Sequence, residues 1–332
     1  REVAARYGVP AWYTDYRRLL AETDAAAVIN LTPIQLHAVT TLAAVRAGKH
    51  VYSEKPVAGT VAEAKQIRDE ARRRGVTVVC APSVMLFPQL VAARALLADD
   101  AIGPVHAAVG QGHGGVPPWH GYLSDPSPFF THGGGPLADM AVYPLHAITG
   151  LLGPARRVSA MAARAQTSFV VPDGPAQGKT VPIDVPDNWL LQLDLGDNRL
   201  AAITANNVAQ ASRAPQLELF GLRGTLGINI LDVAAPLALY RPDSGWREIP
   251  VPHARAGGPD HLLGVEHLVD CVTQNTEPVI GIDHAIHVLD ILDGAARAAS
   301  SGRTVDLALR SATFAPQIDD GDGDTESVST RR

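Results

Sequence analysis

The sequence predicts an α/β protein built from two units, a parallel-sheet unit followed by an α+β unit with a largely antiparallel open sheet. Short apolar runs at 25–30, 50–53 and 76–81 alternate with helical patterns at 34–47 and 61–74. This alternation is typical of a βαβαβ arrangement with a parallel sheet and right-handed crossovers. With 332 residues, 46% of them hydrophobic, the chain can form two cores. We expect domains at 1–101 and 102–315, and a disordered polar tail at 316–332.

Local signals set the boundaries of the parallel-sheet unit. The run at 25–30 is nearly all apolar, as in a parallel strand that is covered on both faces. Gly48 follows the first helical pattern, where a left-handed residue ends a helix. Thr60 and Glu63 have the spacing of a capping box, and the apolar stripe of that helix ends before Gly75.

The residues that leave the parallel strands are the first candidates for a binding site. Ligands of such sheets bind outside the carboxyl ends of the strands. Thr32 and Pro33 follow the first strand, 54–56 the second and 82–83 the third. We expect all three exits to line one crevice.

The second unit shows strand patterns that are separated by turn-rich segments. They lie at 105–109, 158–163, 189–195, 200–205 and 216–220, and the segment 194–198 indicates a hairpin turn between two of them. Helices are predicted at 87–98, 265–273 and 284–300. Helices on one face of such a sheet give an α+β architecture.

Composition and charge exclude several classes of protein. The net charge is −6 and the basic residues are scattered, so no footprint for nucleic acid is visible. Cys80 and Cys271 lie far apart and suggest neither a disulfide nor a thiolate metal site. No apolar run reaches the about 18 residues of a membrane span. We expect a cytoplasmic protein that binds a small molecule, with no nucleic acid and no membrane as partner.

Lys55 is the first candidate for chemistry. Pro56 biases it toward an extended conformation, so its ammonium has a defined direction. A lysine in this place can polarise a hydroxyl oxygen or, with a pKa lowered by burial, carry its proton. A surface lysine paired with Glu54 is an equally simple interpretation.

A second group of candidates follows three consecutive glycines at 133–135. Asp139, Tyr143 and His146 are spaced i, i+4 and i+7, which predicts one polar face on one helix. Pro144 is expected to weaken or kink that helix between Tyr143 and His146. The alternative is an ordinary capped helix with His146 satisfied in a core.

These motifs in this order resemble the Gfo/Idh/MocA oxidoreductases, the family of glucose-fructose oxidoreductase and inositol dehydrogenase. Thr32-Pro33 with His37, then the residues 47–51 leading into Glu54-Lys55-Pro56, resemble the cofactor edge of that family. The glycines before Asp139, with an aromatic residue four positions later, resemble its active-site helix. Gly302-Arg303 before 305–307 is similar to the family's closing segment. The resemblance covers nearly the whole chain.

The resemblance implies an enzyme that oxidises or reduces a hydroxyl group of a sugar, polyol or related compound by hydride transfer to or from NAD or NADP. It also implies a homodimer or homotetramer. The cofactor-binding residues would be Thr32, Pro33, His37, Glu54 and Lys55. The catalytic residues would be Lys55, Asp139 and Tyr143, with Tyr143 as acid/base and its phenolate favoured by Lys55. Trp119 and His146 would contact the substrate.

The sequence departs from the family pattern at its start. The first strand, glycine-rich turn and helix that hold a pyrophosphate would precede Arg1. We therefore expect a truncated Rossmann-type sheet that lacks its first βαβ unit and the pyrophosphate-binding loop. Such a chain would bind the dinucleotide weakly and would leave an edge of its sheet exposed.

One glycine pattern is a poor candidate for the missing loop. Gly110, Gly112 and Gly115 match G-x-G-x-x-G, but Val116 and two prolines follow where a helix should begin. We expect these glycines to serve a strand or turn instead of a phosphate.

Other functions stay open at this point. A non-catalytic module that binds a sugar or a partner protein could retain the same scaffold, and an NAD-assisted glycosidase could use the same site. A metal-dependent lyase or isomerase is suggested by histidines around Asp139, which are His113, His120, His132 and His146. Their spacing matches no compact ligand motif, so we expect no metal site.

Overall fold

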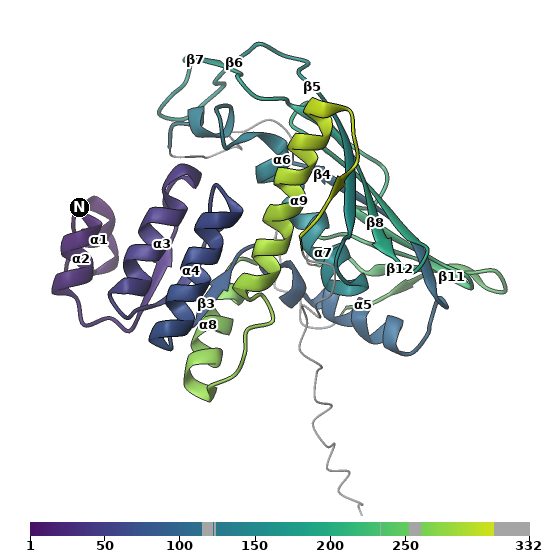
Figure 1. Ribbon diagram of the computed structural model, residues 1–332, viewed down its shortest axis with the longest axis horizontal. Helices are drawn as coiled ribbons and strands as arrows, with labels where there is room; N and C mark the ends of the chain where they lie inside the picture. The colour runs from purple at the N-terminus through teal and green to yellow at the C-terminus, as the bar shows by residue number, and fades with distance from the viewer. Residues whose placement is uncertain (115–121, 123, 233, 252–259, 309–332) are drawn as a thin grey trace, which may run out of the picture.

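The structure is a computed structural model that describes residues 1–114, 122, 124–232, 234–251 and 260–308. It contains a three-stranded parallel sheet, a nine-stranded mixed sheet and a two-stranded hairpin (Figure 1). The predicted fold class, a parallel α/β unit followed by a mostly antiparallel sheet with helices, is confirmed. The predicted tail at 316–332 lies outside the described residues, and the domain boundary between 101 and 102 stays a prediction.

The first unit follows the predicted order of strands and helices. Its elements are α1 (Glu2–Tyr7), α2 (Tyr16–Glu22), β1 (Ala27–Asn30), η1 (Ile34–Leu36), α3 (His37–Arg46), β2 (His50–Ser53), α4 (Val61–Arg74) and β3 (Val78–Cys80). The strands pair in parallel in the order β1-β2-β3. The capping box of Thr60 and Glu63 is present, and Gly75 ends α4 at φ 65°. The helix predicted at 34–47 begins as a short 3-10 turn.

Helices cover both faces of β2, because neighbouring residues of a strand point to opposite faces. On one face, Thr41 Oγ1 of α3 donates to Ser53 Oγ at 3.0 Å. On the other face, α8 packs its Gly264 against the ring of Tyr52. A Cβ atom at Gly264 would lie 2.3 Å from Tyr52 Cε2, so only glycine allows this contact.

The second unit contains more strands than the sequence predicted. Its first elements are η2 (Ser83–Leu86), α5 (Pro88–Ala98), β4 (Val105–His113), η3 (Ser127–Phe129), α6 (Gly135–Asp139), α7 (Val142–Leu152), β5 (Arg157–Ala163), β6 (Ser168–Val170), β7 (Thr180–Pro182), β8 (Asn188–Gly196) and β9 (Arg199–Asn206). These are followed by β10 (Leu217–Gly221), β11 (Gly224–Ile228), β12 (Leu237–Arg241), β13 (Gly245–Ile249), α8 (Leu262–Gln274), α9 (Ile282–Ser301) and β14 (Val305–Asp306). The large sheet has the order β13-β12-β11-β10-β4-β9-β8-β5-β14, and β4 pairs with β9 in parallel.

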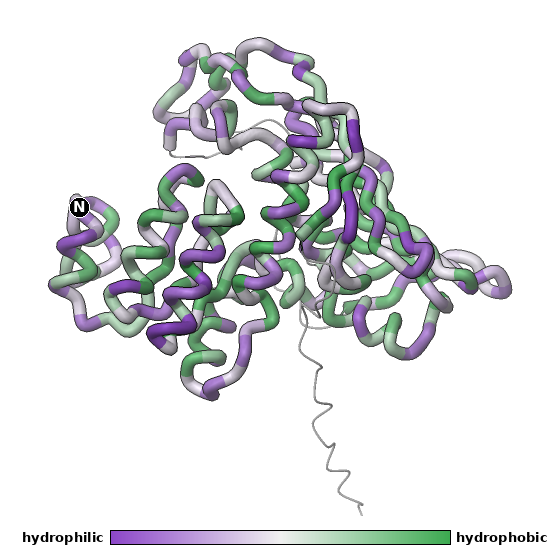
Figure 2. Tube along the Cα trace, viewed as in Figure 1, coloured by the Kyte–Doolittle hydropathy of each residue, from purple (hydrophilic) through white to green (hydrophobic). Residues whose placement is uncertain are grey.

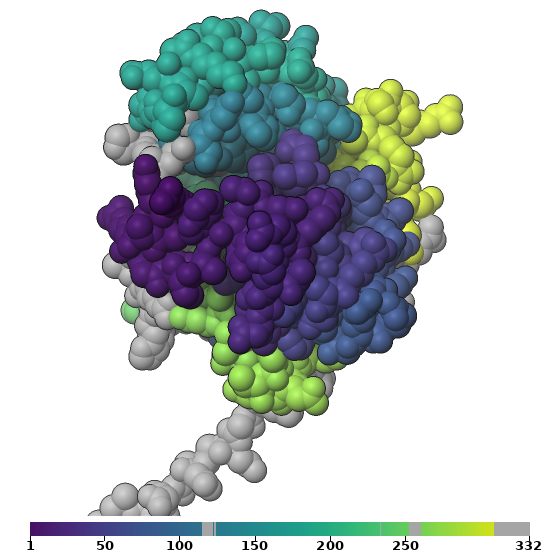
Figure 3. All heavy atoms as spheres, turned by 90° about the vertical axis from the view of Figure 1, so that its left-hand side faces the viewer, coloured from purple at the N-terminus to yellow at the C-terminus, as the bar shows by residue number. Residues whose placement is uncertain are grey.

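Helices α7 and α9 pack against this sheet and bury their apolar residues there. Hydrophobic and hydrophilic residues follow one another along α4 and α9 in Figure 2, as expected of helices with one buried face. On the side drawn in Figure 3, the segment around β6 and β7 (teal) lies above α1–α3 (purple). Gln35 Nε2 of η1 donates to Pro128 O of η3 at 3.4 Å, which joins the first unit to the second. No helix in the described part of the chain combines the length and hydropathy needed to span a membrane.

The glycines of the G-x-G pattern make room for the helices behind β4. A Cβ atom at Gly110 would lie 2.7 Å from Pro144 Cβ, and one at Gly112 would lie 2.7 Å from Met140 O. Both positions belong to β4, and no helix begins at either of them. Gly115 lies outside the described residues. In the described part, the pattern therefore serves close packing of a helix on a strand.

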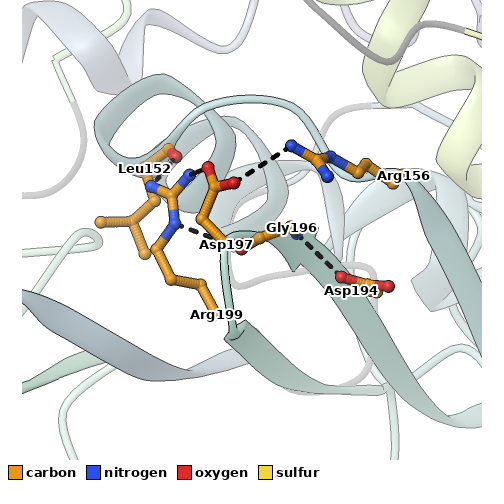
Figure 4. A network of polar contacts seen from close by, with 6 residues as sticks. All are labelled: Leu152, Arg156, Asp194, Gly196, Asp197 and Arg199. Carbon is orange, nitrogen blue, oxygen red and sulfur yellow. Dashed lines mark hydrogen bonds and ion pairs between the residues drawn. The ribbon is translucent and has the colours of Figure 1, made fainter.

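The predicted hairpin at 194–198 is confirmed as the turn between β8 and β9. Asp197 and Asn198 have φ values of 53° and 59°, as a tight turn with two left-handed residues requires. Gly196 N donates to Asp194 Oδ1 at 2.8 Å (Figure 4). Arg199 pairs with Asp197 and donates to Leu152 O at 2.6 Å, which fastens the turn to the end of α7.

β1 forms an edge of the described parallel sheet and carries exposed apolar side chains. Ile29 and Leu31 are 48% and 67% exposed, and Leu36 and Val39 beside them are about half exposed. The exposed edge expected from the sequence is thus present among the described residues.

We expect Gly264→Ala to destabilise the protein by about 1–3 kcal/mol, the usual cost of overpacking, because the added methyl group collides with Tyr52. Urea unfolding followed by circular dichroism measures the change. Gly227→Ala is the matched control, since its Cβ atom would meet nothing nearer than 3.4 Å. Equal stability of the two variants would show that α8 does not depend on this close contact.

Candidate active site

Lys55 leaves β2 and meets Asp139 at the end of α6. Its ammonium donates to Asp139 O at 2.6 Å and forms a very short ion pair with Asp139 Oδ1. The two side chains are 12% and 8% exposed. Glu54 Oε2 accepts instead from the backbone N–H of Lys55 at 3.1 Å. The alternative of a surface lysine whose ammonium pairs with Glu54 is therefore wrong.

Tyr143 completes the group that the sequence placed together. Lys55 Nζ lies 5.1 Å from the centroid of the Tyr143 ring, and Tyr143 is 8% exposed. The second carboxylate oxygen, Asp139 Oδ2, is buried and has no hydrogen-bond partner among the described residues. A buried carboxylate oxygen without a donor is costly, so this atom is suited to accept a hydroxyl from a bound molecule.

The helix after the glycines is not continuous, which corrects the prediction from the sequence. α6 ends at Asp139 and α7 begins at Val142. Pro144 has no N–H, so in a continuous helix it could not bond to the carbonyl of Met140 and its ring would clash there. The interruption therefore lies one turn before the expected kink, and Pro144 sits in the first turn of α7, where no N–H is needed.

The ion pair holds Lys55 in its charged form. Burial lowers the pKa of Lys55, but the Asp139 carboxylate, Tyr143 and the hydrogen bonds to Asp139 raise it, and the net pKa lies above the ordinary value. Of the two roles considered for this lysine, the geometry favours the cation that polarises an oxygen over the neutral base.

Tyr143 is held as a phenol, which differs from the expectation. Burial raises the pKa of Tyr143; the charge of Lys55 lowers it, while Asp139 and Glu54 raise it further. The net pKa lies above the ordinary value. Lys55 therefore lowers the pKa of Tyr143 as expected, but burial raises this pKa by more.

The sequence missed His261, which also lies at this site. It is the residue directly before the first turn of α8, and its ring centroid lies 6.5 Å from that of Tyr143. Its Nδ1 atom is buried and has no hydrogen-bond partner within the described ranges. Burial lowers the pKa of His261, and Lys55 lowers it as well, while Glu54 and Asp260 raise it. No motif marks this histidine; the only signal was a histidine directly before an apolar helical run.

The residues predicted to contact the dinucleotide lie together at the exits of β1 and β2. Thr32 Oγ1 donates to Asn30 Oδ1 at 2.8 Å, and Pro33 precedes η1. His37 is 3% exposed, and its Nδ1 and Nε2 atoms lie 2.7 Å from Pro56 O and Thr32 O. The His37 ring thus joins the two exits, and contact with a cofactor would require one of these bonds to break. The exits of β1 and β2 are direct neighbours, because Glu54 N donates to Asn30 O at 3.0 Å. A single crevice lined by all three exits stays a prediction.

Asn30 is a second residue that the sequence did not single out. Its Nδ2 atom donates to His37 O and to the hydroxyl groups of Thr40 and Thr41 at 2.7 and 2.8 Å. It is 4% exposed. This network fixes the end of β1 and the start of α3, so that the exit next to Lys55 is rigid.

His146 belongs to a cluster of buried histidines on α7 and α9. Its Nδ1 donates to Val142 O at 2.8 Å, and its ring lies 4.8 Å from that of His284 on α9. His287 Nε2 accepts from Ala155 N at 3.0 Å. The geometry fits a histidine that is satisfied in the core, and its contact with a substrate stays a prediction. Trp119, the other residue predicted to bind substrate, lies outside the described residues.

No group of three histidine, cysteine, aspartate or glutamate side chains is placed to hold a metal ion within the residues that the structure describes. A cavity of about 1020 Å³ lies at the other end of the parallel sheet, at the amino ends of β2 and β3. Its lining includes Arg68, Arg72, Thr77, Glu277 and Asp283, and it shares no residue with the Lys55 group.

The fold and this group of residues define a class of protein, in which a dinucleotide-binding parallel sheet presents a lysine to the active-site residues of a second sheet-containing domain. Two family models match the chain. Residues 1–81 match an oxidoreductase family with an NAD-binding Rossmann fold, and residues 90–227 match the GFO/IDH/MocA C-terminal domain. The chain belongs to the Gfo/Idh/MocA family of oxidoreductases.

Relatives with names and solved structures agree with this assignment. An uncharacterised oxidoreductase of Synechocystis is 25% identical over 88% of this chain and 82% of its own length. Levoglucosan dehydrogenase of Pseudarthrobacter phenanthrenivorans is 24% identical over 69% of this chain and 61% of its own length, so less than two thirds of that relative is matched. A solved structure of levoglucosan dehydrogenase in complex with NADH and levoglucosan is similar with a TM-score of 0.78 at 21% identity, covering 93% of this chain and 87% of that one.

We expect acid to weaken the fold through the buried histidines. Burial lowers the pKa of His146 and of His287 to about 4, whereas the ordinary value is 6.5. Between pH 6.5 and about 4, the unfolded chain therefore binds a proton at each of these histidines and the folded chain does not. Each histidine lowers the free energy of unfolding by about 1 kcal/mol for every pH unit of acidification in that window. Urea unfolding at several pH values measures the slope.

His146→Asn should reduce this slope, and the exposed His106→Asn should leave it unchanged. If His146→Asn unfolds with the same pH dependence as the parent chain, the histidine is not buried in its neutral form.

Proposed function

We propose that this chain is an NAD(P)-dependent oxidoreductase that acts on a hydroxyl group of a sugar, a polyol or a related compound by hydride transfer. The observation that carries the proposal is the meeting of Lys55, Asp139 and Tyr143 at the carboxyl edge of the parallel sheet. The family and the sugar named for levoglucosan dehydrogenase support the substrate class.

The residues present suit the nicotinamide end of a dinucleotide. The exits of β1 and β2 meet at the sheet edge where such folds bind cofactors, and Asp139 Oδ2 is buried without a donor in the described structure. In this proposal Thr32, Pro33, Glu54 and Lys55 border the cofactor. The bound nicotinamide supplies the chemistry of accepting or returning a hydride.

The chain's own residues then prepare the substrate. Lys55, held as a cation, donates to the reacting oxygen and stabilises the negative charge that develops on it. Asp139 keeps the ammonium in place and accepts a hydroxyl of the substrate through Oδ2. Tyr143 contacts the same oxygen and exchanges its proton.

We also propose that the chain forms a homodimer or homotetramer through the outer face of the large sheet. Met161, Leu190 and Leu200 point to the same face of β5, β8 and β9, and they are 73%, 53% and 61% exposed. Apolar side chains gathered on one sheet face mark an interaction surface. The cytoplasmic location expected from the sequence stays a prediction.

Replacing Lys55 by Met tests the proposed chemistry. We expect turnover to fall about 10²–10⁴-fold, because the hydroxyl loses the cation that polarises it. The measurement is reduction of NAD or NADP with a panel of sugars and polyols, combined with calorimetric titration of NADH and NADPH to separate binding from chemistry. Retention of most activity would remove Lys55 from the mechanism.

One control accompanies this variant, and two outcomes would favour another function. Lys55→Met leaves the Asp139 carboxylate buried and alone, so the Lys55→Met/Asp139→Asn double variant, which removes both charges, controls for misfolding. Ligand binding by the parent chain without cofactor reduction would favour a sugar-binding module, and release of a glycoside leaving group without net oxidation would favour an NAD-assisted glycosidase.

Leu190→Asp tests the proposed assembly. A carboxylate in the middle of the apolar face should dissociate the oligomer into monomers in light-scattering measurements after size exclusion. Trp246→Asp is the matched control, because Trp246 is equally exposed but lies at the far edge of the sheet on β13. An unchanged mass for Leu190→Asp would exclude this face as the interface.

A further inference from the structure

The site as described holds both expected acid/base groups in their protonated forms. Asp139 keeps Lys55 charged, and burial keeps Tyr143 a phenol. Oxidation of a hydroxyl group releases a proton, and a group that already carries its proton cannot take another. A proton acceptor in its basic form is therefore needed within reach of Tyr143.

His261 is placed to be that acceptor. Its ring lies beside the ring of Tyr143 at a centroid distance of 6.5 Å, on the side of the site formed by α8. Its buried Nδ1 lacks a hydrogen-bond partner among the residues described, so this atom is available for a new hydrogen bond. The 6.5 Å joins the two ring centroids, and one water molecule or one substrate hydroxyl can bridge the polar atoms of rings this close.

The groups around His261 keep it in the form that can accept a proton. Glu54 and Lys55 face it from the exit of β2, Tyr143 from α7, and Asp260 precedes it in its own segment. Burial and the Lys55 cation lower its pKa, while the two carboxylates raise it, and the net shift is downward. The imidazole is therefore neutral at pH 7, unlike the lysine and the phenol beside it.

The buried histidines of α7 and α9 make other contacts and are not the proposed proton acceptor. His146 donates from Nδ1 to the backbone carbonyl of Val142 and packs against His284. The ring that is paired with the ring of Tyr143 is that of His261. His261 is thus the basic group that the described structure places next to the phenol.

We propose that His261 is the proton acceptor of the oxidation, and this rests on the oxidoreductase function proposed above. The substrate O–H gives its proton to Tyr143 Oη while the phenol passes its own proton to His261 Nδ1, directly or through the bridging hydroxyl. The carbinol C–H bond breaks with its electron pair, which leaves as a hydride to an oxidised nicotinamide, and a carbonyl forms. In the reverse direction the imidazolium returns the proton.

The test compares His261→Asn with the parent chain and with His106→Asn, an exposed histidine that serves as the control. For the parent chain we expect kcat/KM for oxidation to fall on the acid side with one ionisation below 6.5, since the imidazolium cannot accept a proton. His261→Asn should lose about 10²–10⁴-fold in this rate at pH 7 and should lose the acid limb. In His261→Ala, added imidazole should restore part of the rate.

A variant that keeps the parent rate and the parent pH profile would overturn the proposal. Absence of any cofactor-dependent turnover in the parent chain would instead count against the oxidoreductase function itself, so the two failures are distinguishable.

A measurement without turnover gives a second check. In the isolated chain with isotope-labelled histidine, the NMR signal that disappears in His261→Asn should titrate below 6.5, and Glu54→Gln should move it lower still, because Glu54 raises this pKa. A signal that titrates above 6.5 would show an imidazole already protonated near neutral pH, which also overturns the proposal.

Discussion

The ion pair between Lys55 and Asp139 is the interaction on which the site depends. It joins the exit of β2 in the parallel sheet to the end of α6 in the second unit, and both partners are almost fully buried. Each charge alone would cost several kcal/mol to remove from water, so neither is tolerable without the other. The ammonium makes both of its described hydrogen bonds to Asp139, one to the carboxylate and one to the backbone carbonyl. The two units are therefore held in the relative position that the chemistry needs.

Burial and this pair together shift the pKa values of the neighbouring side chains, and different side chains therefore take different roles at the site. A lysine that is locked as a cation can stabilise negative charge on oxygen but cannot take a proton. The same cation lowers the pKa of Tyr143 by less than burial raises it, and it lowers the pKa of His261 further. The electrostatic role and the proton-accepting role consequently fall on different side chains. On the cofactor side, the hydrogen bonds of Asn30 and His37 hold the strand exits together.

The parts of this architecture that the sequence predicted are those set by local periodicity. The βαβαβ order, the capping box at Thr60 and the hairpin at Asp197 follow from spacing and turn chemistry within a few residues. The meeting of Lys55 with Asp139 was expected only from the resemblance to the family, because the two residues are 84 positions apart and no local spacing links them. The interruption at Met140 was placed one turn too late, since a proline acts on the carbonyl four residues before it. Strands β11–β13 were missed because their pairing is decided by neighbours in the sheet and not by their own sequence.

His261 could not be predicted from the sequence, because its place at the site depends on how α8 packs on the parallel sheet. Its nearness to Tyr143 depends on how closely α8 approaches β2, and that approach is set by Gly264 three residues further along. Residues three apart on a helix share a face, so the face that packs on Tyr52 also carries the imidazole toward the site. A side chain at Gly264 would push α8 outward and carry His261 away from the phenol. The glycine that lets α8 cover the sheet therefore also fixes the distance over which a proton would have to travel.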